Sequence, residues 1–321
     1  MRFALSPEQL NFTASVRELL ATSDVASAVR SWSAGDYRPG RALWGRLADT
    51  GLTALGLSEP QGGFGATTVD LVLGFEELGR FAVPGPFVES VAVLPVLLDG
   101  TADSALVTAI GAGEVLATLA MPPHVPYAVD AAAADAIYLL EAGQLHRAKA
   151  GERLESVDGA RRLGELVADR ALAESRDSGR AFAIGALATA AQLLGAGHAL
   201  LERAGEYAKQ RVQFGRPIGQ FQAVKHQLAD ALVGLEFARP LLLAGALAIG
   251  ERSGTLERDV SAAKVACTDA AYRAARTSLQ VHGAIGYTDE YDLSLWLRKV
   301  RALTSAWGTQ QVHRSRVLAA L

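Results

Sequence analysis

The chain has 321 residues, of which 50% are apolar, and its 31 basic and 34 acidic side chains give a formal net charge of -3. This length is sufficient for about two domains with a substantial core. The near-neutral charge lacks the basic excess that nucleic-acid binding requires, so we expect no nucleic-acid partner. A single cysteine, Cys267, excludes an intrachain disulfide, and no CxxC metal motif is present.

The first hundred residues (1–100) have the pattern of an N-terminal helical domain. Ser6, Pro7 and Glu8 supply an N-cap, a first-turn proline and an acidic first turn for a helix that extends to about Leu20. Further helices are predicted at 41–49, 68–79 and 94–98. Because Ser6 to Glu8 interrupt the apolar start at once, neither a signal nor a transit peptide fits, and we expect a cytoplasmic protein.

A change of pattern marks residues 101–166. The apolar runs 115–121 and 136–140 are short, contain β-branched residues and are separated by prolines and glycines. These features favour strands over helices. We therefore expect a reduced, β-rich middle region.

Alanine-rich segments dominate residues 167–321. Four of them, at 180–213, 220–252, 256–283 and 289–320, predict a C-terminal four-helix bundle, so the fold class is mainly α. The stretch 181–201 carries no formal charge and is long enough to span a bilayer. Its alanine and glycine content, with Thr189, Gln192 and His198 inside it, favours a buried bundle helix, and we expect no membrane span.

Two segments differ from this alanine background, YAKQRVQFGRPIGQFQAVKHQLAD at 207–230 and QVHGAIGYTDEYDLSLWLRKVR at 280–301. They resemble the acyl-CoA dehydrogenase family, the flavoenzymes that desaturate acyl thioesters between Cα and Cβ. The segment LWGRLADTGLTALGLSEPQGGFG at 43–65 is similar to the entry into that family's first domain. The resemblance implies an acyl-CoA dehydrogenase-like fold, FAD as the cofactor, an acyl-CoA substrate and an acceptor of the electron-transfer flavoprotein type.

The residue types in these segments suit a flavin dinucleotide. The guanidinium of Arg211 is a rigid fork of donors that matches a pyrophosphate, Phe214 offers a flat apolar surface, and Gly215 permits a tight turn. Taken singly, these residues also suit a helix cap, a solvated helix position or a plain interhelical turn. The resemblance implies cofactor contacts for Arg211, Gln213, Phe214, Gln222, Gln280, Gly283, Ala284, Gly286 and Thr309, with Gln222 on the adenosine part and Ala284 in place of the usual second glycine.

The catalytic base of the family is missing from this sequence. In most members a glutamate precedes a Gly-Thr pair near the C-terminus; here Gly308 and Thr309 follow Trp307, and an indole cannot abstract a proton. Other members carry the glutamate 26 positions before the arginine that matches Arg211, which is Gly185 here. Glu290 belongs to the family's turn sequence, where a structural role fits it better.

The middle region departs from the family as well. Members that hold their own flavin carry a TEPxxGSD-like strand and a tryptophan-containing strand, and neither occurs between residues 115 and 166. The chain therefore resembles the small, base-less subunit of the α2β2 acyl-CoA dehydrogenases of actinobacterial steroid and cholesterol degradation. The resemblance implies a larger partner subunit with the flavin pocket and the glutamate, and no catalytic residue in this chain.

Two alternatives remain open at the sequence level. The chain could be a self-sufficient acyl-CoA dehydrogenase whose base has moved to another carboxylate such as Glu202 or Glu206. It could also be a structural or binding subunit that keeps the fold without a cofactor role. The acyl group itself cannot be read from the sequence, because apolar helix positions line the family's substrate cavity.

Overall fold

The computed structural model describes residues 4–175 and 177–321. Short helices fill the N-terminal part, as the sequence predicts. The first of them begins with a capping box, in which the Ser6 hydroxyl accepts from the Gln9 N–H and the Gln9 side chain accepts from the Ser6 N–H. The helices of this part are α1 (Pro7–Ala21), α2 (Val25–Ala34), α3 (Arg38–Ala48), α4 (Thr68–Arg80), α5 (Leu94–Leu97), which continues a π-helical turn at Val88–Val93, and α6 (Ser104–Gly111).

The middle part forms a mixed sheet, with the strand order β1-β3-β4-β5-β2. The strands are β1 (Ala117–Ala120), β2 (Ala128–Val129), β3 (Ala136–Glu141), β4 (Gln144–Leu154) and β5 (Leu163–Glu174). β1 is parallel to β3, and the other neighbouring strands are antiparallel. β1 and β3 are largely buried, whereas most residues of β4 and β5 are exposed or half-buried.

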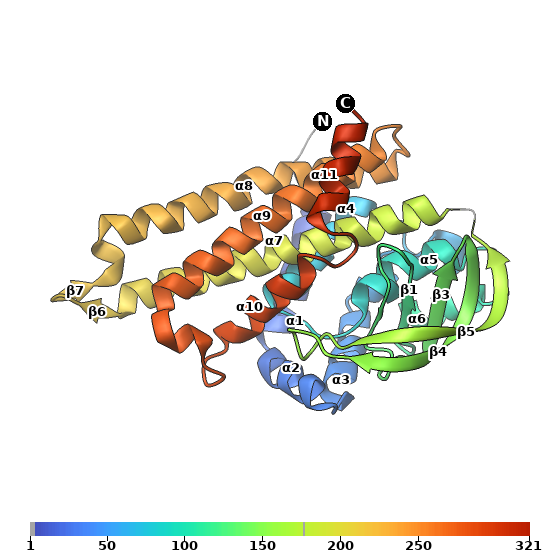
Figure 1. Cartoon of the computed structure of the whole chain (residues 1–321), viewed down its shortest axis with the longest axis horizontal. Helices are drawn as coiled ribbons and strands as arrows, with labels where there is room; N and C mark the ends of the chain where they lie inside the picture. Colours follow the sequence, from blue (N-terminus) through green and yellow to red (C-terminus); the bar gives the residue numbers. More distant parts are fainter. Residues whose placement is uncertain (1–3, 176) are drawn as a thin grey trace.

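Three long helices of the C-terminal part lie side by side and run the length of the molecule (Figure 1). They are α7 (Ser178–Gln210), α8 (Gln222–Gly250) and α9 (Leu256–His282), followed by α10 (Leu293–Leu303) and α11 (Gln310–Ala319). α7 and α8 are both long and apolar enough to cross a membrane. The most apolar 18-residue window of α7 is 94% buried inside the protein, as the prediction of a buried bundle helix requires.

The glycines of α7 explain how closely it packs against the N-terminal helices. A Cβ atom at Gly195 would lie 1.8 Å from the carbonyl oxygen of Glu76 on α4, and a Cβ at Gly79 would lie 2.0 Å from the carbonyl oxygen of Gln192 on α7. Only glycine lets the two backbones approach this far. These contacts join the N-terminal helices to the C-terminal bundle.

The structure adds detail at two of the boundaries that the sequence predicts. The predicted domain boundary at residue 166 falls inside β5, because the exposed, mixed-polarity end of that strand has no apolar run that a sequence pattern could detect. The single helix predicted at 289–320 is two helices, α10 and α11. Trp307 and Gly308, which lie between these two helices, have positive φ values of 55° and 94°, and a helix cannot continue through that conformation.

Candidate functional site

The end of the bundle that carries the first motif is a small hairpin. Arg211 ends α7, and β6 (Val212–Gln213) then pairs with β7 (Arg216–Pro217) through a two-residue turn. The turn residues Phe214 and Gly215 have φ of 52° and 80°, as in a type I′ turn. Glycine adopts this conformation freely, whereas phenylalanine does so at a cost in backbone strain.

The Phe214 ring projects into solvent from this turn. It is 93% exposed and is in T-shaped contact with the Phe221 ring, with ring centroids 6.1 Å apart. The side chain of Gln213 is also exposed, although its amide donates to the backbone carbonyl of Val212 at 2.7 Å.

The second motif forms a groove at the same end, between α8 and the end of α9. The groove has a volume of about 380 Å³, and its lining residues are mainly polar: Gln227, Arg276, Thr277, Leu279, Gln280, Gly283 and Tyr287. Gly283 has a φ of 64° and a ψ of −141°, and a Cβ added there would meet no atom within 4 Å. The structure thus brings Gln280 and Gly283 together in an open, donor-rich groove.

Packed side chains beneath the surface connect the two motifs. The Tyr207 ring on α7 stacks on the His282 ring on α9 at a centroid distance of 4.4 Å, next to a cluster of Ala204, Ala208 and Val281. The Nδ1–H of His282 donates to the Ser278 carbonyl at 2.8 Å. Burial lowers the pKa of His282 below its ordinary value, so the ring is neutral at pH 7.

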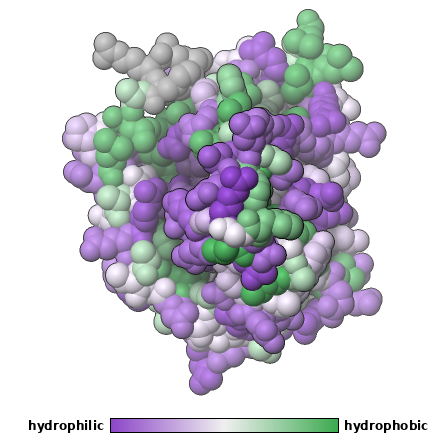
Figure 2. All heavy atoms as spheres, turned by 90° about the vertical axis from the view of Figure 1, so that its left-hand side faces the viewer, coloured by the Kyte–Doolittle hydropathy of each residue, from purple (hydrophilic) through white to green (hydrophobic). Residues whose placement is uncertain are grey.

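Positive charge without an internal counter-charge gathers at this end. Arg211, Lys225 and Arg276 are exposed, and none has a carboxylate within 4 Å in the part of the chain that the structure describes. Gln222 is the exposed first residue of α8. Figure 2 shows this end of the molecule as a mainly hydrophilic surface with hydrophobic patches between the polar groups. Such a surface suits an anionic, partly aromatic ligand.

Three of the predicted contact residues have other surroundings. Ala284 is exposed beside Gly283 and is not among the residues that line the groove; Gly286 is buried, where a Cβ would lie 2.9 Å from Leu279. Thr309 does not line the groove. Its hydroxyl caps α11 by accepting from the Val312 N–H, which is a structural role.

The two positions at which the family carries its base lie against each other. A Cβ at Gly185 on α7 would be 2.3 Å from the Trp307 ring, so the indole occupies the space that a side chain at 185 would need. Trp307 is 1% exposed, and its carbonyl accepts from the Nε2–H of His313 at 2.9 Å. The indole therefore leaves no room for a carboxylate side chain at either of the two positions.

A buried carboxyl group next to this indole was missed by the sequence reasoning. Glu89 lies on the π-helical turn and is 2% exposed, and its Oε1 accepts from the Trp307 indole N–H at 3.1 Å. Burial raises the pKa of Glu89 above its ordinary value, and the charge of Arg161 opposes part of that shift. A lone acid inside the apolar run 86–98 was the signal that could have identified it.

The space around Glu89 is too small for an acyl thioester. The enclosed cavity that Glu89, Arg161, Gln192 and Trp307 help to line measures about 20 Å³, enough for roughly one water molecule. The two carboxylates considered as displaced bases lie at the surface instead. Glu202 is 62% exposed and pairs with Arg80 at 2.6 Å, and Glu206 is 63% exposed and pairs with Lys209 at 2.6 Å.

Comparison with known protein families matches both ends of the chain. Residues 6–105 match the family model "Acyl-CoA dehydrogenase, N-terminal domain", and residues 176–321 match "Acyl-CoA dehydrogenase, C-terminal domain". Among curated relatives, the acyl-CoA dehydrogenase IpdE2 of Mycobacterium tuberculosis is 32% identical over 288 residues, which cover 88% of each chain.

Solved structures share the fold over nearly the whole chain. A chain of the ChsE4-ChsE5 complex from Mycobacterium tuberculosis has a TM-score of 0.85 at 22% identity, covering 99% of this chain and 98% of that one. A chain of the Tcur3481-Tcur3483 steroid ACAD has a TM-score of 0.86 at 23% identity, covering 97% of each. At these identities the likeness concerns the fold.

Proposed function

The chain belongs to the acyl-CoA dehydrogenase family, whose members are FAD-dependent flavoproteins, and we propose that it is the smaller subunit of a heteromeric α2β2 member. In this proposal a larger partner subunit holds the flavin ring and carries the glutamate base. This chain supplies contacts to the dinucleotide end of the partner's FAD through its hairpin and groove.

One observation carries the proposal. The indole of Trp307 fills the space beside Gly185, and these are the two positions where family members place the base. The carboxyl group that remains nearby belongs to Glu89. It faces a cavity of only about 20 Å³, which is too small to admit a substrate. Proton abstraction from an acyl thioester needs a carboxylate within hydrogen-bond reach of the substrate, so another chain has to provide it.

The residues at the hairpin end fit the dinucleotide part of FAD. Arg211 and Arg276 are exposed cations without a carboxylate partner among the described residues, and guanidinium groups bind phosphate oxygens through two parallel hydrogen bonds. Gly283 leaves the backbone open to close approach, since no atom lies within 4 Å of the place of its missing side chain. Gln222 and Gln280 add amide donors and acceptors for the adenosine part.

When bound, FAD accepts the hydride that leaves Cβ of the acyl group during desaturation. The residues of this chain do not take part in that bond-breaking. They bind and orient: Arg211 and Arg276 neutralise the negative charge of the pyrophosphate, and Phe214 covers an aromatic or apolar surface of the neighbouring subunit. Their effect on the reaction is through the occupancy and position of the cofactor.

Exposed apolar side chains support a partner subunit. Besides Phe214, the outer face of α8 presents Leu232, Val233, Phe237 and Leu241, which are 44%, 51%, 76% and 42% exposed. Only 44% of the most apolar window of α8 is buried within this chain. A contiguous face of this kind is typical of an oligomer interface.

The remaining parts of the proposal follow from the relatives. A steroid-type or other lipid acyl-CoA is the proposed substrate, because similar folds include a steroid ACAD and a two-component complex. We further propose an electron-transfer flavoprotein-type acceptor and a cytoplasmic location. A self-sufficient enzyme is disfavoured, because its candidate bases Glu202 and Glu206 lie at the surface in ion pairs. The experiment below distinguishes our proposal from a cofactor-free structural subunit.

The test is to co-express the chain with its partner and to change Arg211→Ala. We expect flavin occupancy of the purified complex to fall at least tenfold at limiting FAD, because a bidentate phosphate contact is lost. Arg153→Ala is the matched control, since Arg153 is exposed on the distant strand β4 and has no ion pair with any residue that the structure describes. Unchanged occupancy in the Arg211→Ala complex would favour the cofactor-free structural subunit.

A further inference from the structure

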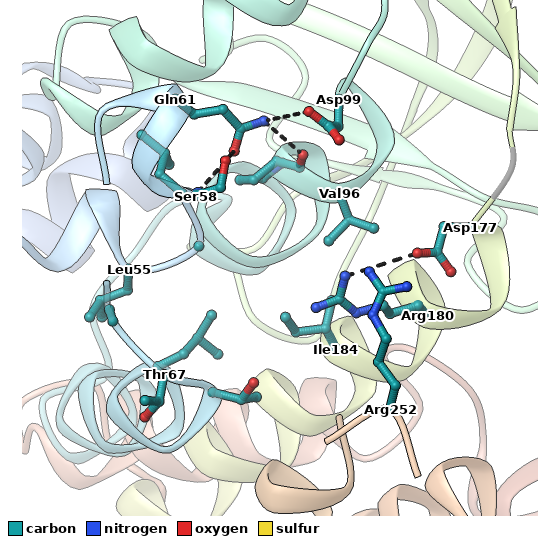
Figure 3. A pocket seen from close by; sticks show the side chains of 16 residues that line it. Leu55, Ser58, Gln61, Thr67, Val96, Asp99, Asp177, Arg180, Ile184 and Arg252 are labelled. Atoms are coloured by element: carbon teal, nitrogen blue, oxygen red, sulfur yellow. Dashed lines mark hydrogen bonds and ion pairs between the residues drawn. The ribbon is translucent and has the colours of Figure 1, made fainter. Parts of the chain in front are cut away.

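A second cavity opens at the opposite end of α7. It has a volume of about 280 Å³ and lies between the loop 55–61, the starts of α4 and α7, the end of α5 and the turn after α8 (Figure 3). Arg180 at this end and Arg211 at the hairpin end are 31 residues apart, about 46 Å along a helix. The cavity is therefore far from the proposed flavin contacts, and it shares no lining residue with the Trp307 pocket.

Two arginines face this cavity side by side. Figure 3 shows the guanidinium groups of Arg180 and Arg252 next to each other beside Asp177. Arg180 reaches Asp177 only at 4.0 Å, and its Nε is buried without a hydrogen-bond partner. Arg252 has no carboxylate within 4 Å among the described residues, and it extends from a backbone with a φ of 50°.

Two neighbouring cations repel each other unless an anion lies between them. A carboxylate is the anion that best matches the planar fork of a guanidinium, and it can accept from both groups at once. Asp177 does not fill this role, because its side chain is 44% exposed and its contact with Arg180 is at the limit of an ion pair. Asp99 does not either, since it accepts from Gln61 at 3.3 Å on another part of the wall (Figure 3).

The rest of the wall is mixed. Leu55, Leu71, Pro95, Val96 and Ile184 form its apolar part, and Ser58, Gln61, Thr67, Thr68 and the two aspartates form its polar part. Its volume corresponds to about nine water molecules, slightly below the usual range for drug-sized ligands. A ligand of about eight or nine non-hydrogen atoms, with one charged end and an apolar body, would fill it.

We propose that this cavity binds a small organic carboxylate, with its head on Arg180 and Arg252 and its aliphatic body against the apolar part of the wall. The proposal is independent of the flavin contacts. Its site is built from three parts of the chain: the N-terminal helices, the start of α7 and the α8–α9 turn. Occupancy of the site would therefore tie the N-terminal helices to the C-terminal bundle.

Hexanoate is the probe, because it has eight non-hydrogen atoms and one carboxylate. Binding to the full chain, or to its complex with the partner, is measured by titration calorimetry and by saturation-transfer NMR. We expect hexanoate to bind at least tenfold more tightly than acetate, which lacks the apolar body, and than hexylammonium, which has the opposite charge. Equal binding of acetate would indicate an adventitious ion only, and equal binding of hexylammonium would indicate an apolar cavity without charge selection; either result overturns the proposal, as does no binding of hexanoate.

Two variants locate the site. Arg252→Gln removes an exposed guanidinium and should weaken hexanoate binding at least tenfold, while Val96→Phe should block the cavity by bulk. Arg301→Gln is the matched control, since Arg301 is exposed and its guanidinium donates to the Thr304 hydroxyl outside the cavity. Flavin content of the complex should be unchanged in all three, so a failure of this site is distinguishable from a failure of the flavin proposal. Unchanged hexanoate binding in Arg252→Gln would refute the assignment.

Discussion

The contact between Gly185 and Trp307 gives the sharpest prediction of stability. A Cβ at position 185 would lie 2.3 Å from Cε3 and 2.5 Å from Cδ2 and Cζ3 of the indole, so the ring would have to move by about 1 Å to reach ordinary van der Waals contact. The ring is not free to move. Its N–H is bound to Glu89 and its carbonyl to His313, and the residue is 1% exposed.

Gly185→Ala should therefore destabilise the protein in spite of its better helix propensity. Overpacking a rigid core destabilises a protein by up to about 3 kcal/mol. Replacing a helical glycine with alanine stabilises it by about 1 kcal/mol. The free energy of unfolding should fall by about 2 kcal/mol. At roughly 2–4 °C for each kcal/mol, the melting temperature should fall by about 4–8 °C.

Gly205→Ala on the same helix is the matched control. A Cβ at Gly205 meets no atom within 4 Å, so this change should stabilise the protein by about 1 kcal/mol. Thermal unfolding followed by circular dichroism compares the two variants. In a Trp307→Phe background the cost of Gly185→Ala should shrink, since the smaller ring leaves room for the methyl group. If both glycine changes stabilised the protein equally, the indole would not close the base positions and the reasoning would be refuted.

The remaining predictions concern pH, chemistry and the groove. Burial lowers the pKa of His313 to about 4, so its contribution to stability is present above pH 6.5 and is lost as the pH falls through 4; His313→Gln should flatten acid unfolding curves in that window. Trp307→Glu should give no desaturase activity in the isolated chain, which a flavin-reduction assay with an acyl-CoA checks. Gly283→Ala should reduce flavin occupancy of the complex at least fivefold, whereas Ala284→Gly should not reduce it. Equal effects of the two changes would contradict the proposal that the groove at Gly283 contacts FAD.

The helical architecture was accessible from sequence because its signals are local. Ser6 and Pro7 mark a helix start by their own chemistry, and the long alanine-rich segments of α7, α8 and α9 hold one secondary structure over 27 to 33 residues. The short helices α2 and α6 went undetected, since 8 to 10 residues carry too little periodic signal. The π-helical turn at 88–93 depends on packing and has no local signature.

The candidate site divides in the same way. Motif residues such as Arg211, Gln280 and Gly283 could be named from the sequence, and the structure gathers them at one end of the bundle. Glu89 could not be assigned to the Trp307 pocket, because 218 residues separate the two partners of that hydrogen bond. The pairing of Arg180 with Arg252 is likewise a product of the fold, since the turn after α8 meets the start of α7 only in three dimensions.

The flavin-to-chain ratio of the native complex tests the central claim most directly. The chain is purified from cells with the partner it retains, and FAD is quantified by absorbance against both polypeptides. Our account predicts one FAD for each pair of larger and smaller subunits, and no flavin on this chain when it is purified alone. A yellow isolated chain with one FAD per polypeptide that desaturates an acyl-CoA would contradict it.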